Sequence, residues 1–409
     1  MAFGKWLMAD GSFAALTLWQ ESSCHRPSSD RRERAIERAL RAGRRHKVGG
    51  NRFFMSTNVS IGPLTLSSNL LLAPLAGYTT LPFRLCMREV GGFGLATTEL
   101  IHARSLLEQH NKAKALAQTC PGDSPLAVQL FGAVAEELRD AAQLVEASSV
   151  AVVDINMGCP VEKVVSRGAG AAMLRDPVHT GKFVSTITRA VKIPVTVKTR
   201  LGWKEGQLDA VQLAPILEDA GIAALTIHGR TREGAFGGSV NRAGIHAVVQ
   251  SVRALPVFGN GDVRDFHSAK LMFAETGCAG LVIGRAALTN PWVFREITAV
   301  LAGEPLPPPP TLLDRVSLMT RHFLLAVAFR GEHLACLQFR KMIDWYARAF
   351  GPCKRLRLGL KELSSVGQYH EMVGQFLEER GLGCDTPAAT LAPPFTVSAS
   401  FLALRPFEA

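Results

Sequence analysis

Short apolar runs alternate with longer helix-patterned stretches eight times between residue 70 and about residue 300, and this alternation constrains the fold more than any other feature. The runs are rich in β-branched residues, so they predict parallel strands covered by the intervening helices. Eight such units close into a barrel, and we therefore predict an α/β protein with a (β/α)8 TIM-barrel fold. The expected strands are Leu70–Gly77, Leu95–Leu100, Leu126–Gly132, Val150–Gly158, Val195–Arg200, Ala223–Gly229, Val257–Asp262 and Gly280–Arg285.

Amphipathic helices are expected between these strands. Two of them cover Ala135–Ala147 and Gln207–Ala220, and Gly221 is placed to end the second one. In a barrel of this kind the loops after the carboxyl ends of the strands build the active site. Polar residues at the strand ends are therefore the candidates for chemistry.

A proline-rich break follows the predicted barrel. Pro305 and Pro307–Pro310 stiffen the chain there, and from Leu312 to about Glu379 the sequence is helical in pattern without strand signals. Met55 is a second candidate for the first residue of the protein. The expected parts are a poorly ordered basic extension over residues 1–60, the barrel over 61–304, a small helical domain over 311–380 and a low-order tail over 381–409.

The composition is that of a globular protein, with 409 residues of which 47% are hydrophobic. No apolar stretch is long enough to span a bilayer, and the first twenty residues fit a secretory signal poorly. The eight cysteines stand singly and form no metal-ligand spacing with histidines. We therefore expect a monomeric cytoplasmic protein that binds neither a membrane nor a metal.

The net charge of +11 favours a polyanionic partner, because lysine and arginine side chains that neutralise phosphates release counterions. From Arg26 to Lys47, nine basic residues stand against three acidic ones, a net of +6, which leaves +5 for the rest of the chain. More than half of the excess thus lies outside the expected barrel. We interpret this segment as a solvated basic arm.

The ends of the last two expected strands favour an anion site. Gly259, Asn260, Gly261 and Asp262 follow one strand, and Gly284 with Arg285 follows the next. Glycines let backbone N–H groups approach a phosphate, and the arginine adds positive charge. Such a site indicates a phosphorylated ligand, and the absence of a GxGxxG motif after the first strand favours flavin over a Rossmann-type nicotinamide site.

Taken in order, the strand ends resemble those of the tRNA-dihydrouridine synthase family over roughly residues 64–380. The segments that carry this resemblance read APLAG at 73–77, QLFG at 129–132, DINMGCP at 154–160, VKTR at 197–200, HGRTR at 228–232, GNGD at 259–262 and GRA at 284–286. The stretch FRKMIDWY at 339–346 is similar to the bacterial B-type branch. The resemblance implies an oxidoreductase that binds FMN, takes electrons from NADPH and reduces uridine in tRNA.

Several residues have expected roles toward the flavin. A buried lysine is costly unless it is paired, and the resemblance implies that Lys198 stabilises the negative charge of the reduced flavin ring. Gln129 is expected to hydrogen-bond the ring edge, and Pro74, Leu75 and Ala76 are expected to present backbone to it. His228 either contacts the flavin phosphate or the substrate, or is a histidine satisfied within the core.

Cys159 is the candidate proton donor. A lone cysteine is usually a small buried hydrophobe, and we interpret the other seven in that way. Cys159 differs because it follows Asn156 at the reactive end of a strand and precedes a glycine-bearing loop. The resemblance implies that reduced flavin delivers hydride to C6 of uracil while the thiol protonates C5 and Asn156 orients the base.

The expected helical domain carries basic residues suited to docking tRNA. They are Arg340, Lys341, Lys354 and Arg355, followed by Arg357 and Lys361. A uridine in folded tRNA has to leave its stack to reach the barrel mouth, and contacts elsewhere offset that cost. The branch resemblance favours the D-loop, with position 17 first.

Two alternatives stay open at this stage. A flavin barrel that acts on a free pyrimidine would explain the flavin site and Cys159 but not the basic helices. A non-catalytic RNA-binding barrel would explain the charge but not the retention of Cys159, Lys198 and Arg285. Fold alone does not decide among them, because barrels host many chemistries.

Overall fold

The computed structural model describes residues 58–148 and 150–382. Most of the expected basic extension, including its arm from Arg26 to Lys47, lies outside the described residues, as does the expected tail from residue 383 onward. Val59 and Ser60, which fall inside the expected extension, belong instead to a short strand. The strand forms because Gly62, at a φ of +57°, allows the chain to turn back on itself.

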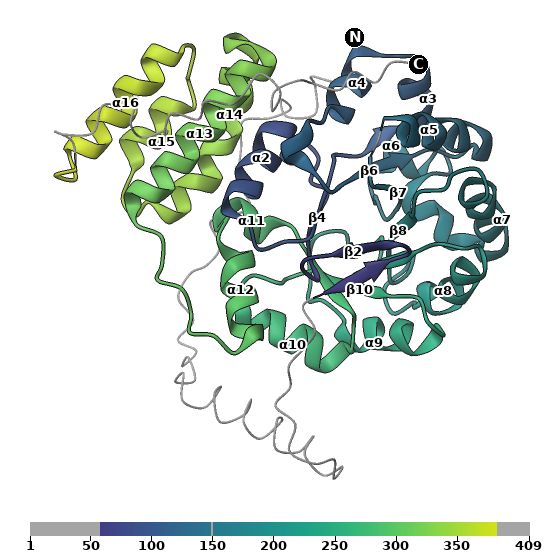
Figure 1. Cartoon of the computed structure of the whole chain (residues 1–409). Helices are drawn as coiled ribbons and strands as arrows, with labels where there is room; N and C mark the ends of the chain where they lie inside the picture. Colours follow the sequence, from purple (N-terminus) through teal and green to yellow (C-terminus); the bar gives the residue numbers. More distant parts are fainter. Residues whose placement is uncertain (1–57, 149, 383–409) are drawn as a thin grey trace. The chain divides into compact units, whose positions relative to one another are not determined.

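Eight parallel strands form a closed ring, which confirms the predicted TIM barrel (Figure 1). The ring closes where β4 pairs with β6, and a two-residue strand, β5 (Ile101–His102), also pairs with β6. In order around the ring, the strands are β3 (Leu70–Leu72), β4 (Leu95–Thr97), β6 (Leu126–Phe131), β7 (Val152–Met157), β8 (Val195–Arg200), β9 (Ala224–His228), β10 (Val257–Asn260) and β11 (Gly280–Ile283).

Most strands end earlier than the sequence predicts. The clearest case is β3, which was expected to continue to Gly77 but ends at Leu72. Pro74 has no N–H to give to a ladder, so the segment that follows β3 leaves the sheet and becomes a loop at the barrel mouth. The shorter strands thus lengthen the loops that form the site.

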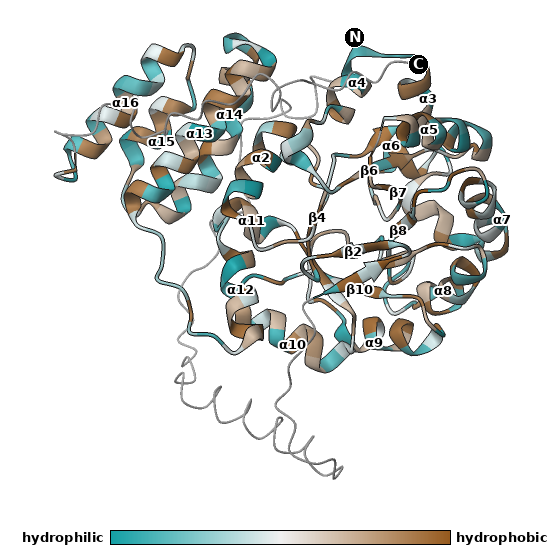
Figure 2. Ribbon diagram, viewed as in Figure 1, coloured by the Kyte–Doolittle hydropathy of each residue, from teal (hydrophilic) through white to brown (hydrophobic). Residues whose placement is uncertain are grey.

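Helices surround the ring, with hydrophilic residues on their outer faces and mostly hydrophobic strands inside them (Figure 2). The expected helix Ala135–Ala147 is confirmed as α5, and the other one is shorter than expected, as α8 (Asp209–Asp219). The remaining barrel helices are α2 (Leu81–Val90), α3 (Ala103–Leu107), α4 (Asn111–Ala117), α6 (Glu162–Val165), α7 (Pro177–Thr188), α9 (Arg242–Ser251), α10 (Phe266–Thr276), α11 (Arg285–Thr289) and α12 (Val293–Ala302).

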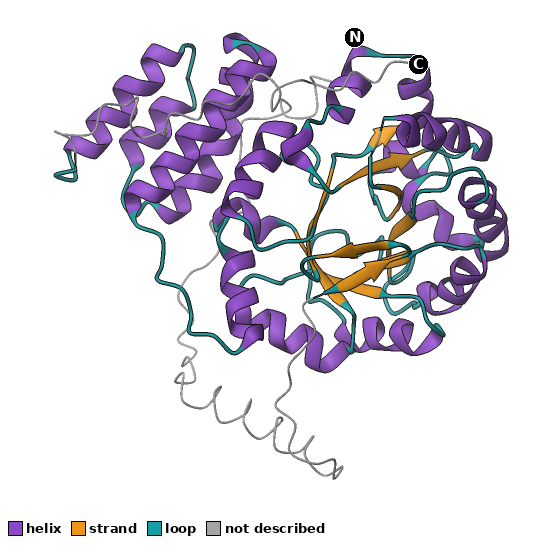
Figure 3. Cartoon of the chain, viewed as in Figure 1, coloured by secondary structure: helices purple, strands orange, loops and turns teal. Residues whose placement is uncertain are grey.

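A β-hairpin covers the amino-terminal end of the barrel. It consists of β1 (Val59–Ile61) and β2 (Leu64–Leu66), which pair in antiparallel fashion across the opening of the ring (Figure 3). Ile61 and Leu66 are each 1% exposed and pack with inward-facing apolar residues such as Phe258. The hairpin therefore seals this end with a hydrophobic contact.

The C-terminal part is helical, as the sequence predicts. It comprises α13 (Leu312–Arg330), α14 (Glu332–Tyr346), α15 (Lys354–Leu360) and α16 (Val366–Glu378). A capping box between Thr311 and Asp314 starts α13 directly after the prolines. Helix α13 packs on α2, where Arg321 forms an ion pair of 3.0 Å with Glu89. Among the described residues, no helix is both long and apolar enough to cross a membrane.

Candidate active site

One cavity of about 360 Å³ opens at the carboxyl ends of the strands. All barrel residues that the sequence analysis placed in the site line this cavity, although they come from loops more than 200 residues apart. They are Pro74, Leu75, Ala76, Gln129, Asn156, Cys159, Lys198, His228, Asn260, Gly261, Asp262, Gly284 and Arg285. The parallel ring brings them together because every strand presents its carboxyl end at the same mouth.

Two amide side chains form one wall of the cavity. Asn156 Nδ2 donates to Gln129 Oε1 at 2.8 Å. Asn156 Oδ1 accepts from the backbone N–H groups of Gly158 and Cys159 at 3.2 and 3.0 Å. Asn156 thus fixes the turn that follows β7, and this turn places the Cys159 side chain at the cavity.

The Cys159 thiol is half-buried and remains protonated at neutral pH. Burial raises the pKa of the Cys159 thiol above its ordinary value of 9.0, although the N–H of Val161 and the charge of Arg200 act in the opposite direction. A protonated thiol next to a cavity can give up a proton to a bound molecule. Cys159 therefore has the state that a general acid requires.

Lys198 is a buried cation in the centre of the site. Its Nζ donates to Asn260 Oδ1 at 2.9 Å, and Asn260 Nδ2 in turn donates to the carbonyl of Val282 at 2.6 Å. Burial lowers the pKa of Lys198 to about 8, with Arg200 adding to the shift and Asp154 opposing it. A cation held by a neutral amide rather than by a carboxylate remains available to stabilise negative charge on a ligand.

Three guanidinium groups gather around Asp262 at one side of the cavity. Arg230 Nη2 donates to Asp262 Oδ2 at 2.6 Å, Arg285 Nη2 donates to Oδ1 at 3.1 Å, and Arg264 lies 3.6 Å from the same oxygen. One carboxylate does not neutralise three cations, so this side carries a net positive charge. That balance favours an anion such as a phosphate group.

Two buried nitrogen atoms at the same side lack a hydrogen-bond partner among the described residues. They are Nδ1 of His228 and Nη1 of Arg230. Gly261, at a φ of +119°, packs beside both residues, and a Cβ there would lie 2.7 Å from Val240 Cγ2 and 3.7 Å from Arg230 Nη1. Burial, together with the neighbouring cations, lowers the pKa of His228 to about 2, so its ring is neutral. Buried polar atoms of this kind are expected to bind a ligand.

The loop after β3 forms the neighbouring wall, because β3 pairs with β11 in the ring. The N–H of Leu75 donates to Thr79 Oγ1 at 3.0 Å, and the N–H of Gly77 donates to the buried carboxylate of Glu99. These bonds hold the backbone of residues 74–76 against the cavity. Tyr78, which also lines the cavity, makes an edge contact with Trp345 of α14 at a centroid distance of 5.8 Å.

Sequence reasoning missed Arg200 and Phe236. Arg200 Nε donates to the carbonyl of Gly158 at 2.7 Å, and its Nη1 donates to the carbonyls of Thr231 and Ala235. Phe236, 63% exposed, lies over this guanidinium at 5.5 Å and lines the cavity. The alternation of a strand was the available signal for Arg200, because it stands two residues after Lys198 and faces the same side.

The basic residues expected to dock RNA do not form one free surface. Arg340 is half-buried, and its Nε donates to the carbonyl of Leu363 at 2.9 Å. Arg355 forms an ion pair of 3.0 Å with Glu379, while Lys361 pairs with Asp344 at 3.1 Å. Lys341 and Lys354 are exposed, and neither has an ion-pair partner within residues 58–382. The expected basic residues thus differ in their partners: some are bonded to the backbone, some form ion pairs, and some are exposed without an ion-pair partner among the described residues.

A TIM barrel whose mouth combines an anion-binding side, a lysine and a protonated thiol fits an oxidoreductase of the flavin-dependent class. A family model described as "Dihydrouridine synthase (Dus)" matches residues 71–379. The chain belongs to this family of FMN-dependent oxidoreductases.

Curated relatives agree with the family match over most of their length. The tRNA-dihydrouridine synthase B of Pseudomonas aeruginosa is 36% identical over 323 residues, which cover 79% of this chain and 96% of the relative. The protein of the same name from Pseudomonas putida is 37% identical over 332 residues, 80% of this chain and 97% of the relative. A probable tRNA-dihydrouridine synthase of Mycobacterium tuberculosis is 36% identical over 315 residues, 75% of this chain and 81% of the relative.

The residues of the cavity fit the flavin that the family implies. The unpartnered atoms of His228 and Arg230 lie on the side where three guanidinium groups surround Asp262, as a phosphate requires. Lys198 and Gln129 offer N–H donors deeper in the barrel, where the ring system would need them. No group of three or more potential metal ligands gathers within the part of the chain that the structure describes.

Proposed function

We propose that this enzyme is a tRNA-dihydrouridine synthase that reduces the 5,6 double bond of a uridine in the tRNA D-loop, with position 17 as the first candidate. NADPH is the electron donor, and FMN carries the electrons to the base. The names of the relatives support the substrate class. The observation that carries the proposal is the single cavity that joins a protonated thiol, two oriented amides and a buried cation beside an anion site.

In this proposal the cavity would hold FMN. Lys198 and Gln129 bind polar atoms of the ring, and Pro74, Leu75 and Ala76 present their backbone to it. The phosphate would lie on the arginine-rich side, where the proposed contacts are His228, Asn260, Gly261, Asp262, Gly284 and Arg285. Asp262 can serve only through its backbone N–H, because its carboxylate is negative and accepts from Arg230 and Arg285. When bound and reduced, FMN supplies the hydride that C6 of uracil accepts.

Cys159 supplies the proton that completes the reduction. As the hydride forms a C–H bond at C6, the electron pair of the 5,6 double bond takes the thiol proton at C5. The thiolate that remains is protonated again from solvent, so no net charge stays in the site. Because the pKa of the Cys159 thiol is raised by burial, the proton is present at neutral pH before the base arrives.

Asn156 orients the base in this scheme. Its amide is anchored to the backbone of the Cys159 turn, so a base bound to Asn156 is held at a set position relative to the thiol. Substrate entry requires the uridine to leave its stack, and contacts with the helical region offset this cost. Arg340, Lys341, Lys354 and Arg355 are the proposed tRNA contacts, with Lys341 and Lys354 the most available of the four.

The proposal is tested by incubating unmodified tRNA with the purified protein, FMN and either NADPH or NADH, and by mapping dihydrouridine with mass spectrometry. Dihydrouridine at position 17 with NADPH is the expected result. Free uridine and orotate are added as competitors in a parallel reaction. Turnover of a free pyrimidine without modified tRNA would replace this proposal with the free-pyrimidine alternative, and a colourless protein that binds tRNA without turnover would replace it with a non-catalytic role.

A further inference from the structure

A series of hydrogen-bonded side chains leads from the barrel interior to the turn that carries Cys159. Asp154 lies opposite Gln129 on β6 and opposite Thr196 on β8 in the parallel register. Its Oδ2 accepts from Gln129 Nε2 at 2.7 Å, and its Oδ1 accepts from the Thr196 hydroxyl at 2.6 Å. Asp154 is 6% exposed, and together with Thr196 it lines a small interior cavity of about 20 Å³.

The two ends of this series set the direction of every bond within it. A carboxylate only accepts, so Gln129 has to turn its amide nitrogen toward Asp154 and its oxygen toward Asn156. At the other end the backbone N–H groups of Gly158 and Cys159 only donate, so Asn156 has to turn its oxygen toward them. Both ends therefore require the same orientation of the two amides.

This orientation decides what the cavity offers to a ligand. Each amide nitrogen has two N–H groups, and one of them is used within the series. Gln129 and Asn156 both line the cavity, and the second N–H group of each makes no hydrogen bond among the described residues. A reversed pair of amides would present oxygen atoms instead and would repel carbonyl groups of a ring.

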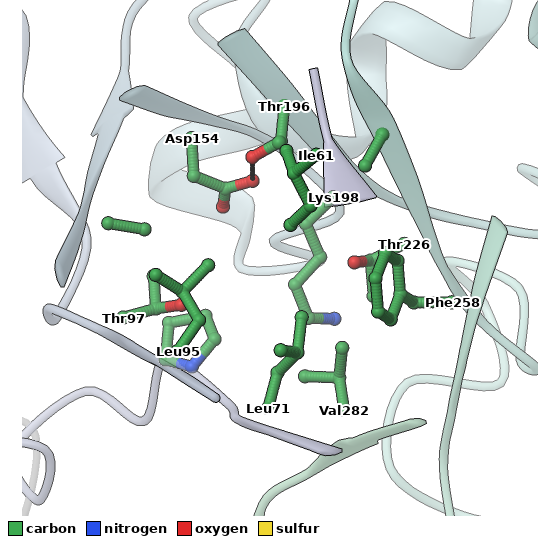
Figure 4. A pocket seen from close by; sticks show the side chains of 13 residues that line it. Ile61, Leu71, Leu95, Thr97, Asp154, Thr196, Lys198, Thr226, Phe258 and Val282 are labelled. Carbon is green, nitrogen blue, oxygen red and sulfur yellow. Dashed lines mark hydrogen bonds between the residues drawn. The ribbon is translucent and has the colours of Figure 1, made fainter. Parts of the chain in front are cut away.

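We propose that Asp154 is a positioning residue that holds Gln129 and Asn156 in the orientation in which both donate to acceptor atoms of the flavin ring and the uracil base. This role rests on the proposed function, because it assigns the ring and the base to those two amides. Asp154 touches neither ligand and acts through its neighbours. Figure 4 shows Asp154 and Thr196 pointing toward one another, with Lys198 at their side.

Thr196 makes the role of Asp154 testable, because a hydroxyl both donates and accepts. In an Asp154→Asn variant the new amide can keep its oxygen toward Gln129 and donate its N–H to Thr196. In a Thr196→Val variant the carboxylate still accepts from Gln129. In the double variant the new amide has no acceptor at position 196, so its nitrogen gains a side-chain partner only by turning toward Gln129. That turn conflicts with the orientation that the N–H groups of Gly158 and Cys159 require of Asn156, so one hydrogen bond of the series is lost.

The experiment compares the parent, both single variants and the double variant. It records the FMN dissociation constant, the visible absorption of the bound flavin, the melting temperature and the single-turnover rate with tRNA. Each single variant is expected to stay within about threefold of the parent rate. The double variant is expected to lose about 100-fold in rate and to shift the flavin absorption, because a small displacement of a reacting group has that effect.

An Asp154→Asn/Thr199→Val variant is the matched control. Thr199 is also a buried threonine of β8, but its hydroxyl donates to the carbonyl of Met157 outside the series. The positioning role is overturned if the rate of the Asp154→Asn/Thr196→Val variant equals the rate expected from multiplying the two single effects. It is also overturned if a lower melting temperature or a lower flavin content accounts for the whole loss of rate. A parent that binds flavin but forms no dihydrouridine overturns the proposed function, and the absorption comparison still tests the series.

Discussion

The two ends of the barrel interior are built on the same eight strands but hold opposite kinds of side chain. At the amino end, Ile61 and Leu66 of the hairpin close the barrel by packing against its hydrophobic core. At the carboxyl end the cavity joins Cys159 and Lys198 to an anion site. Inward-facing residues occur at every second position of a strand. Two or three of them are therefore enough for one strand to reach from the hydrophobic core to the active site. Stability and chemistry are thus assigned to different ends, and each prediction below tests that division.

The largest expected effect is that of Cys159→Ala at the open end. Loss of the proton donor should slow dihydrouridine formation by about 100- to 10,000-fold. Flavin content and melting temperature should stay at parent values, because the side chain is only half-buried. Single-turnover mass spectrometry of tRNA measures the rate, and Cys353→Ala, a half-buried cysteine near α15, serves as the control that should retain activity.

The pH dependence provides an independent check on the same thiol. Because the pKa of the Cys159 thiol is raised above 9.0, the acid form persists through neutral pH and is lost as the pH rises through the raised value. The parent rate should therefore be level near neutrality and fall about tenfold per pH unit above that pKa. An equal alkaline decline in the residual rate of Cys159→Ala would show that another group causes it.

The next largest effect is expected at the sealed end, with Ile61→Ala. Removing these buried carbon atoms should lower the free energy of unfolding by about 2–4 kcal/mol. Ile61 also lines a small interior cavity with Pro74 and Lys198, so FMN affinity and the rate at saturating tRNA are expected to change, but by less than about threefold. Denaturant titration measures the stability, and Thr65→Ala on the exposed side of β2 is the control. A loss of catalysis without a loss of stability would contradict the division between the two ends.

A smaller effect is expected for Arg285→Ala. Removing one of the three guanidinium groups around Asp262 should weaken FMN binding by about tenfold, with little change in melting temperature without FMN. Fluorescence titration of FMN measures the change. Arg253→Ala, which removes an exposed arginine just before β10 at the sealed end, should leave FMN affinity unaltered. Equal effects of both variants would indicate general charge rather than a phosphate site.

The smallest expected effect concerns Lys341→Ala on α14. One exposed lysine that contacts a phosphate should change the tRNA concentration for half-maximal rate by about threefold, and the change should shrink as salt is raised. Flavin reduction by NADPH should be unaffected. Lys270→Ala, an exposed lysine of α10, is the comparison, and an identical shift there would mean that the helical region has no special role in docking.

The sequence predicted the carboxyl end of the barrel far better than the amino end. Residues such as Cys159 and Lys198 stand directly after apolar runs, and the closed ring alone brings such positions together. The hairpin escaped prediction because strands of three residues have no measurable period. Its contacts with the core also join positions that are distant in the chain, such as Ile61 and Phe258.

The second limit of prediction is that the sequence does not show which residues on neighbouring strands or helices form hydrogen bonds with one another. Asp154 stood in an evident motif, yet its role depends on Gln129 and Thr196, which only the register places beside it. Arg340 is a predicted RNA contact, and the structure adds that its Nε donates to the Leu363 carbonyl, a backbone partner that leaves no trace in the residue pattern. Side-chain type is thus readable from the sequence, whereas the partner of that side chain is not.

The hairpin also limits where translation of a working protein can begin. Methionine occurs at positions 1, 8 and 55, and next at position 87. A product that starts at Met55 keeps β1, β2 and every barrel strand, whereas one that starts at Met87 loses the hairpin, β3 and most of α2. Met55 is therefore the most downstream methionine that precedes both the hairpin and all eight barrel strands.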